Sequence, residues 1–73
     1  MDNIKWPRWD TAPAWANYRA ADADGAVYWY EYQPKGQTTY WEATLGLVAY
    51  AGDVKLNGTI WNYTCEFRPQ VPA

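Results

Sequence analysis

The sequence predicts a mainly β protein: a small single domain built on an antiparallel sheet of four to five strands, with little helix. Three observations favour this class. The chain has 73 residues, which is room for one domain. It carries six Trp and seven Tyr, large side chains that favour strands and can fill a small core. Turn signals that contain Gly separate its short strand-like runs.

The clearest predicted element is a β-hairpin that turns at Asp24-Gly25. Strand-like runs 15–21 and 26–33 lie on either side of this dipeptide. Asp-Gly suits a type I′ turn, because both central residues of that turn adopt positive φ. A two-residue loop fixes the register and places Arg19 opposite Tyr30.

Alternation along this hairpin predicts two faces of different character. Successive side chains of a strand point to opposite sides of the sheet. Val27 and Trp29 are expected to face the core. The opposite face is expected to contact a partner, because tyrosine combines a large ring with a polar tip; the alternative is a solvated face. The residues predicted on it are Asn17, Arg19, Tyr28, Tyr30 and Tyr32.

The rest of the chain predicts shorter elements. Segment 34–37 has the composition of a turn, and segments 38–43 and 59–67 have the β-branched and aromatic residues of strands. Segment 45–50 is apolar but contains Gly, so a short buried strand and one turn of helix both fit it.

The first segment, 1–14, predicts an irregular arm laid over the domain, because its prolines exclude a regular strand. Trp6, Arg8 and Trp9 form a second candidate group for partner binding, since Trp and Arg are enriched at interface hot spots. The alternative is that both indoles close one end of the core. The tail, 70–73, is expected to be frayed.

Charge and hydropathy argue against two classes of partner. The formal net charge is −2, with eight acidic and six basic residues interspersed, whereas a duplex nucleic-acid binder usually carries a basic stripe. No apolar run approaches the roughly 20 residues that span a bilayer, and the N-terminus lacks a signal-peptide pattern. We therefore expect no duplex nucleic-acid partner, no membrane partner and a cytoplasmic location.

The sequence also predicts no metal, no cofactor and no catalysis. It has no His, no Ser and one cysteine, Cys65, so it offers neither a disulfide nor a nucleophile–base set. Asp22-Ala23-Asp24-Gly25 begins like a calcium loop, but its twelfth position is Gln33 instead of Glu. Glu31 and Glu42 lie on separate predicted strands, and nothing pairs them as acid and base.

Four short motifs follow one another along the chain and together form a pattern. The opening is Trp9-Asp10 … Ala12-Pro13, the centre is Tyr28-Trp29-Tyr30-Glu31, Tyr40-Trp41 follows, and Arg68-Pro69 closes it. This pattern resembles short accessory proteins encoded by tailed bacteriophages. The resemblance implies a protein that binds, and in some cases inhibits, a host or phage protein in the bacterial cytoplasm.

Two other functions fit the aromatic composition. Stacked Tyr and Trp rings with Arg or Asn suit a small-ligand module for a nucleotide or a sugar. The chain also fits a structural subunit of a phage particle or a homo-oligomer. The preferred expectation is a non-enzymatic accessory protein that binds a protein partner through an aromatic surface.

Overall fold

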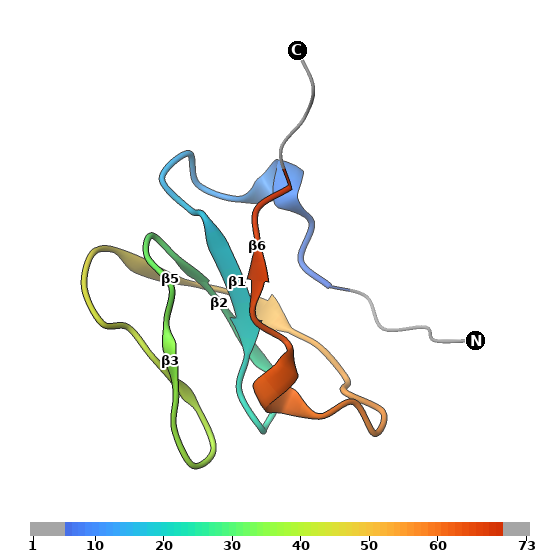
Figure 1. Cartoon of the computed structure of the whole chain (residues 1–73). Helices are drawn as coiled ribbons and strands as arrows, with labels where there is room; N and C mark the ends of the chain where they lie inside the picture. Colours follow the sequence, from blue (N-terminus) through green and yellow to red (C-terminus); the bar gives the residue numbers. More distant parts are fainter. Residues whose placement is uncertain (1–5, 70–73) are drawn as a thin grey trace.

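The computed structural model describes residues 6–69, which form a mainly β chain, so the predicted fold class is confirmed. Within these residues, four strands make an antiparallel sheet in the order β5-β2-β1-β6, and β3 pairs with β4 (Figure 1). The strands are β1 (Tyr18–Ala21), β2 (Ala26–Tyr30), β3 (Lys35–Gly36), β4 (Trp41–Glu42), β5 (Val48–Asp53) and β6 (Glu66–Phe67). Short 3-10 helices are η1 (Trp9–Thr11) and η2 (Trp61–Tyr63). The predicted frayed tail lies outside the described residues, as do the first five residues of the predicted arm.

The β1–β2 hairpin forms where the sequence predicts it, but its loop is one residue longer. The Gly25 N–H donates to the Asp22 carbonyl at 2.9 Å, and the Asp22 N–H donates to the Ala26 carbonyl at 2.8 Å. A type I′ turn requires positive φ at both central residues. Gly25 meets this requirement with φ of +92°, but Asp24 does not, because its φ is not positive. The Asp24 carboxylate instead accepts the Ala26 N–H at 3.0 Å. The loop therefore has three residues, with a left-handed glycine at its end.

The longer loop shifts the β1–β2 register by one residue from the prediction. Arg19 pairs with Trp29, and Tyr18 takes the predicted place of Arg19 opposite Tyr30. Paired residues lie on the same face of a sheet, so the predicted grouping of Arg19 with the tyrosines is wrong. We call the two sides of this hairpin the arm face, which the N-terminal arm covers, and the cleft face, which lines a cleft described below. The arm face carries Arg19, Ala21, Val27 and Trp29; the cleft face carries Tyr18, Ala20, Tyr28 and Tyr30.

The arm face is covered by the segment that precedes β1. Trp9 of η1 packs against Trp29, with ring centroids 5.1 Å apart. Further along this face, small aliphatic side chains form a buried cluster against which Trp6 and Leu56 pack. The cluster comprises Ala21, Val27 and Val54. The core on this face therefore combines small aliphatic side chains with the buried ring of Trp29.

The cleft face is covered in part by the β3–β4 hairpin. The indole N–H of Trp41 donates to the Ala21 carbonyl at 3.0 Å, and the backbone N–H of Trp41 donates to the Asp22 carboxylate at 2.8 Å. The Tyr30 hydroxyl donates to the Trp41 carbonyl at 3.3 Å. Trp41 thus attaches the small sheet to the end of β1 and to β2.

Four segments differ in part from the sequence prediction. The predicted turn 34–37 instead contributes β3, because Lys35-Gly36 pairs with β4. The turn comes later, where the Gln37 N–H donates to the Tyr40 carbonyl at 2.7 Å, so the predicted strand 38–43 is a strand only at β4. Segment 45–50 resolves into a strand, β5, which starts at Val48. Segment 59–67 is not one strand: it contains η2, and the buried Thr64 hydroxyl donates to the Trp61 carbonyl at 2.6 Å before β6 begins.

Within residues 6–69, neither 3-10 helix has the length and hydrophobicity needed to span a bilayer.

Gly25→Ala is expected to destabilise the protein more than Gly58→Ala. Both glycines have positive φ, +92° and +88°, and a left-handed conformation costs an L-residue about 1–2 kcal/mol. A Cβ at Gly25 would also lie 2.3 Å from the Val54 carbonyl oxygen, whereas a Cβ at Gly58 would meet nothing within 4 Å. Urea unfolding of the two variants measures the difference. Equal losses of unfolding free energy would contradict the close approach of residues 25 and 54.

Candidate functional site

Arg19 is a buried structural side chain at the centre of the arm face. Its guanidinium carbon lies 5.1 Å from the Trp6 ring centroid and 5.0 Å from the Trp9 ring centroid. Its Nη1 donates to the Pro7 carbonyl at 2.7 Å, and its Nη2 pairs with the Glu66 carboxylate. These contacts join the arm, β1 and β6. The predicted indoles and Arg19 therefore pack against one another, in agreement with the alternative that the Trp side chains close the core.

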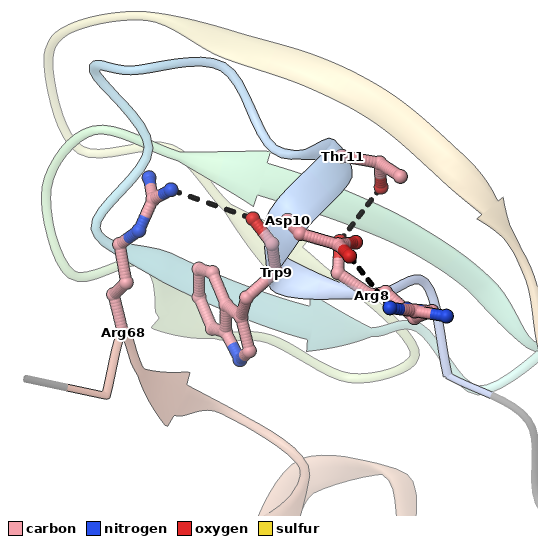
Figure 2. A network of polar contacts seen from close by, with 5 residues as sticks. All are labelled: Arg8, Trp9, Asp10, Thr11 and Arg68. Atoms are coloured by element: carbon pink, nitrogen blue, oxygen red, sulfur yellow. Dashed lines mark hydrogen bonds and ion pairs between the residues drawn. The ribbon is translucent and has the colours of Figure 1, made fainter. Parts of the chain in front are cut away.

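A second arginine fastens the arm from the C-terminal side. Arg68 Nη1 donates to the carbonyls of Pro13 and Ala16 at 3.0 and 2.8 Å, and Nη2 donates to the Trp9 carbonyl at 3.4 Å. Figure 2 shows this guanidinium beside Trp9, with its hydrogen bond to the Trp9 carbonyl and the indole below. Its carbon lies 5.6 Å from the Trp9 ring centroid. The closing arginine of the sequence motif thus has a structural role.

Among Trp6, Arg8 and Trp9, the second predicted contact group, Arg8 is the one whose side chain is largely open to solvent. Its Nη2 pairs with the Asp10 carboxylate at 2.6 Å, and both side chains are mostly exposed (Figure 2). The Arg8 carbonyl accepts the Thr11 hydroxyl at 2.7 Å. An exposed ion pair contributes only about 0–1 kcal/mol. The Arg8 guanidinium can therefore leave Asp10 and contact a partner at little cost.

The three predicted contact tyrosines differ in exposure. Tyr30 is 3% exposed, as buried as Trp29 at 4%, so the expectation that it lies on a wet face is wrong. The physical reason is the β3–β4 hairpin, which covers its ring and accepts its hydroxyl proton. Tyr28 is half-buried and packs edge-on against Tyr50, with centroids 5.5 Å apart. Tyr32 is 47% exposed and follows the end of β2.

A cleft of about 250 Å³ opens between the cleft face and the β3–β4 hairpin. It is lined by Asp22, Tyr28, Tyr30, Trp41, Ala43 and Val48. Trp41 is held on its far side by an edge-on contact with Trp61, at 5.9 Å between centroids. This cleft could not be predicted from the sequence, because its residues come from four separate segments. Tyr28 and Tyr30 were predicted to contact a partner, and Asp22 was assigned to a hairpin turn, but no sequence pattern joins them to Trp41.

Asp22 is an acid held in partly apolar surroundings. Desolvation by burial raises the pKa of its carboxyl, the hydrogen bond from the Trp41 N–H lowers it, and the charge of Asp24 raises it further. Desolvation is the largest of these effects. The ionised carboxylate is therefore less favourable in the folded chain than in the unfolded chain. A desolvated carboxylate in a cleft is typical of a functional position.

An exposed apolar surface that the sequence analysis did not predict lies along β5 and the loop before it. We call it the apolar band; its members are Tyr32, Leu45, Leu47, Val48 and Tyr50, each 47–66% exposed. The loop packs closely on Tyr32, since a Cβ at Gly46 would lie 2.5 Å from the Tyr32 ring. The apolar run 45–50 is the sequence signal for this surface, but the sequence was consistent with a short buried strand or one turn of helix, and neither is an exposed edge strand.

β5 is an edge strand with an open outer side. Within residues 6–69, it pairs with β2 alone. The Glu31 N–H donates to the Leu47 carbonyl at 2.9 Å, so the alternation of an antiparallel ladder directs the backbone groups of Val48 and Tyr50 away from β2. Before its last residue, Asp53, the strand carries no charged residue and no Pro, and neither does the loop 45–47. Natural edge strands usually carry such residues to block further pairing.

Within residues 6–69, the candidate metal ligands are the acidic side chains and Cys65, whose thiol is also a candidate nucleophile. No group of three or more His, Cys, Asp or Glu within 6–69 is placed to hold a metal ion. Cys65 is half-buried, and desolvation by burial raises the pKa of its thiol. A nucleophilic cysteine requires the opposite shift.

Comparisons of the chain with protein-family models, with curated proteins and with solved structures found no match. Function is therefore inferred from the cleft, the apolar band and the open edge of β5.

Tyr30→Ala is expected to destabilise the protein as much as Trp29→Ala, because the two rings are equally buried. Truncation of a buried aromatic side chain costs about 3–5 kcal/mol. Tyr32→Ala serves as the exposed control and should cost much less. Thermal and urea unfolding of the three variants provide the measurement. A Tyr30→Ala protein as stable as the Tyr32→Ala protein would show that Tyr30 is not a core residue.

Asp22→Asn is expected to raise stability at neutral pH. The amide oxygen still accepts the Trp41 N–H, while the desolvated charge is removed. Because the pKa of Asp22 is raised in the folded state, ionisation of its carboxyl lowers the unfolding free energy of the wild type. This loss of stability is absent well below the ordinary pKa of 3.8, grows as the pH rises, and is complete above the folded-state pKa. Melting temperatures at pH 7 and at about pH 3 test this sign. A melting-temperature increase of Asp22→Asn over the wild type that is larger at about pH 3 than at pH 7 would contradict it.

Proposed function

We propose that this protein is a non-enzymatic binding module that takes an extended segment of a protein partner along the outer edge of β5. The observation that carries the proposal is the open edge itself, where the uncharged stretch 45–52 directs the backbone groups of Val48 and Tyr50 away from β2. Main-chain hydrogen bonds to such an edge supply affinity, and alternate side chains supply specificity.

The apolar band supports the proposal, because it flanks the edge on which the partner would lie. Leu47 is 54% exposed and Tyr50 is 58% exposed. In a chain with so small a core, large side chains that are left in water reduce the apolar area buried on folding. A partner that covers them would recover this hydrophobic stabilisation. We place Tyr32, Val48 and Tyr50 in the contact, and leave Arg19 and Tyr30 to structural roles.

The resemblance to phage accessory proteins enters as part of the same proposal. On this reading the partner is a host or phage protein, and the module acts by occupying a surface instead of catalysing a reaction. The raised pKa of the Cys65 thiol supports the non-enzymatic reading, since burial disfavours a reactive thiolate.

Tyr50→Lys is expected to abolish partner binding, while Tyr63→Lys is the matched control. Both tyrosines are exposed, but Tyr63 belongs to η2 and is not a member of β5 or of the apolar band. A lysine on an edge strand blocks the addition of another strand. Affinity capture from host lysate, with quantitative mass spectrometry, should recover a protein with the wild type and with Tyr63→Lys. The Tyr50→Lys variant should recover at least roughly tenfold less of that protein, as expected for the loss of an interface hot spot.

The melting temperature of each variant is measured first, so that loss of binding is not confused with unfolding. Light scattering of the purified wild type, coupled to size exclusion, tests whether β5 instead pairs with a second copy. A stable dimer that Tyr50→Lys dissociates would replace the heterologous partner with this chain itself. Equal recovery by both lysine variants would overturn the β5 edge as the binding surface.

A further inference from the structure

The cleft beside β4 combines aromatic walls with a single charge. Tyr28, Tyr30 and Trp41 contribute rings to its lining, and Asp22 contributes a carboxylate. The Tyr28 and Tyr30 ring centroids are 6.5 Å apart and their planes are inclined by 55°. The lining therefore presents ring surfaces at different angles around one acidic group.

We infer that this cleft binds an organic ammonium group through the Asp22 carboxylate and the rings of Tyr28, Tyr30 and Trp41. The group can come from a free small molecule or from a basic side chain that a protein presents. Both sources share the same chemistry, a positive nitrogen surrounded by methyl or methylene groups. Aromatic cages recognise such groups because the faces of the rings carry partial negative charge.

The charge of the lining selects the sign of the ligand. Among the six lining residues, one is acidic and none is basic. Asp22 Oδ1 accepts the Trp41 N–H, and among the hydrogen bonds of residues 6–69 the other carboxylate oxygen has no donor. A phosphate or carboxylate ligand would meet an uncompensated negative charge, whereas an ammonium group would neutralise it.

The rigidity and size of the cleft also suit a small cationic group. Trp41 is fixed by its indole hydrogen bond to the Ala21 carbonyl at 3.0 Å and by the ring of Trp61. The indole also packs against the backbone of Gly36, where a Cβ would lie in ordinary contact with it, 3.4 Å from Trp41 Cζ3. The cleft of about 250 Å³ is slightly smaller than the roughly 300–1,000 Å³ of drug-sized sites. It therefore fits one side chain or one fragment-sized molecule.

This inference goes beyond the proposed function and does not require it. Val48 belongs both to the apolar band and to the lining of the cleft, so a partner on β5 can extend a basic side chain into it. A free ammonium compound can also enter without any protein partner. Failure of strand addition at β5 would thus leave the cleft untouched, and the two are tested by different variants.

The test is an NMR titration of the isolated chain that follows the indole N–H signal of Trp41. The probes are choline and its uncharged carbon analogue 3,3-dimethyl-1-butanol, at constant ionic strength. Choline should shift the Trp41 signal to saturation, and the carbon analogue should bind roughly tenfold more weakly or not at all. A short peptide with trimethyllysine, and the same peptide with unmodified lysine, distinguish a protein-borne ammonium group from a free one.

Variants assign the effect to the cleft. Asp22→Asn keeps the acceptor for the Trp41 N–H but removes the charge, so choline binding should weaken by roughly tenfold. Asp24→Asn makes the same chemical change in the same hairpin loop, outside the cleft lining, and should leave binding nearly unchanged. Equal binding of choline and its carbon analogue, or equal effects of the two Asn variants, would overturn the inference. Absence of any shift with choline and with both peptides would overturn it as well.

Discussion

The burial of the Arg19 guanidinium against the indoles of Trp6 and Trp9 is the interaction on which the arm face depends. A buried charge is costly unless it is paired and hydrogen-bonded, and here Pro7 and Glu66 supply those partners. The compensation is incomplete, because Arg19 Nε and Trp9 Nε1 are buried without hydrogen-bond partners within residues 6–69. Ring contacts with a desolvated arginine, worth about 2 kcal/mol, offset part of that cost. One side chain therefore joins the arm, β1 and β6, which are otherwise connected by few strand pairs.

The position of the central hairpin could be predicted from the sequence, but its register could not. Asp24-Gly25 indicates a turn through local chemistry, and the flanking aromatic runs indicate strands. The choice between a two- and a three-residue loop depends on tertiary contact: the Val54 N–H donates to the Gly25 carbonyl at 2.8 Å, from a segment 29 residues further along the chain. A shift of one residue moves Arg19 from one face to the other. Arg19 was therefore assigned to the wrong face, although the two strands of the hairpin were predicted correctly.

The candidate sites were harder to predict because exposure is a property of the whole fold. Three tyrosines at a spacing of two indicated a shared face, yet the β3–β4 hairpin covers Tyr30 and leaves Tyr32 in water. The opposite error arose at 45–50, where an apolar run indicated burial. It lies at the sheet edge because the order β5-β2-β1-β6 places it there, and that order is not encoded in local periodicity. The cleft likewise exists only after β4 has docked against the end of β1.

Two charged side chains of the central hairpin, Arg19 and Asp22, lie on opposite faces and have different surroundings. On the arm face, Arg19 has Glu66, a carbonyl and two indoles, so its charge is neutralised within the protein. On the cleft face, burial desolvates the Asp22 carboxylate, and within residues 6–69 its hydrogen bond comes from a backbone amide. Burial that serves stability would pair an acid with a base or replace it with a neutral residue. An acid left without a basic partner among aromatic rings is explained more simply by a positive group that arrives from outside. The arm face thus stabilises the fold, while the two proposed binding sites lie in the cleft and along the edge of β5.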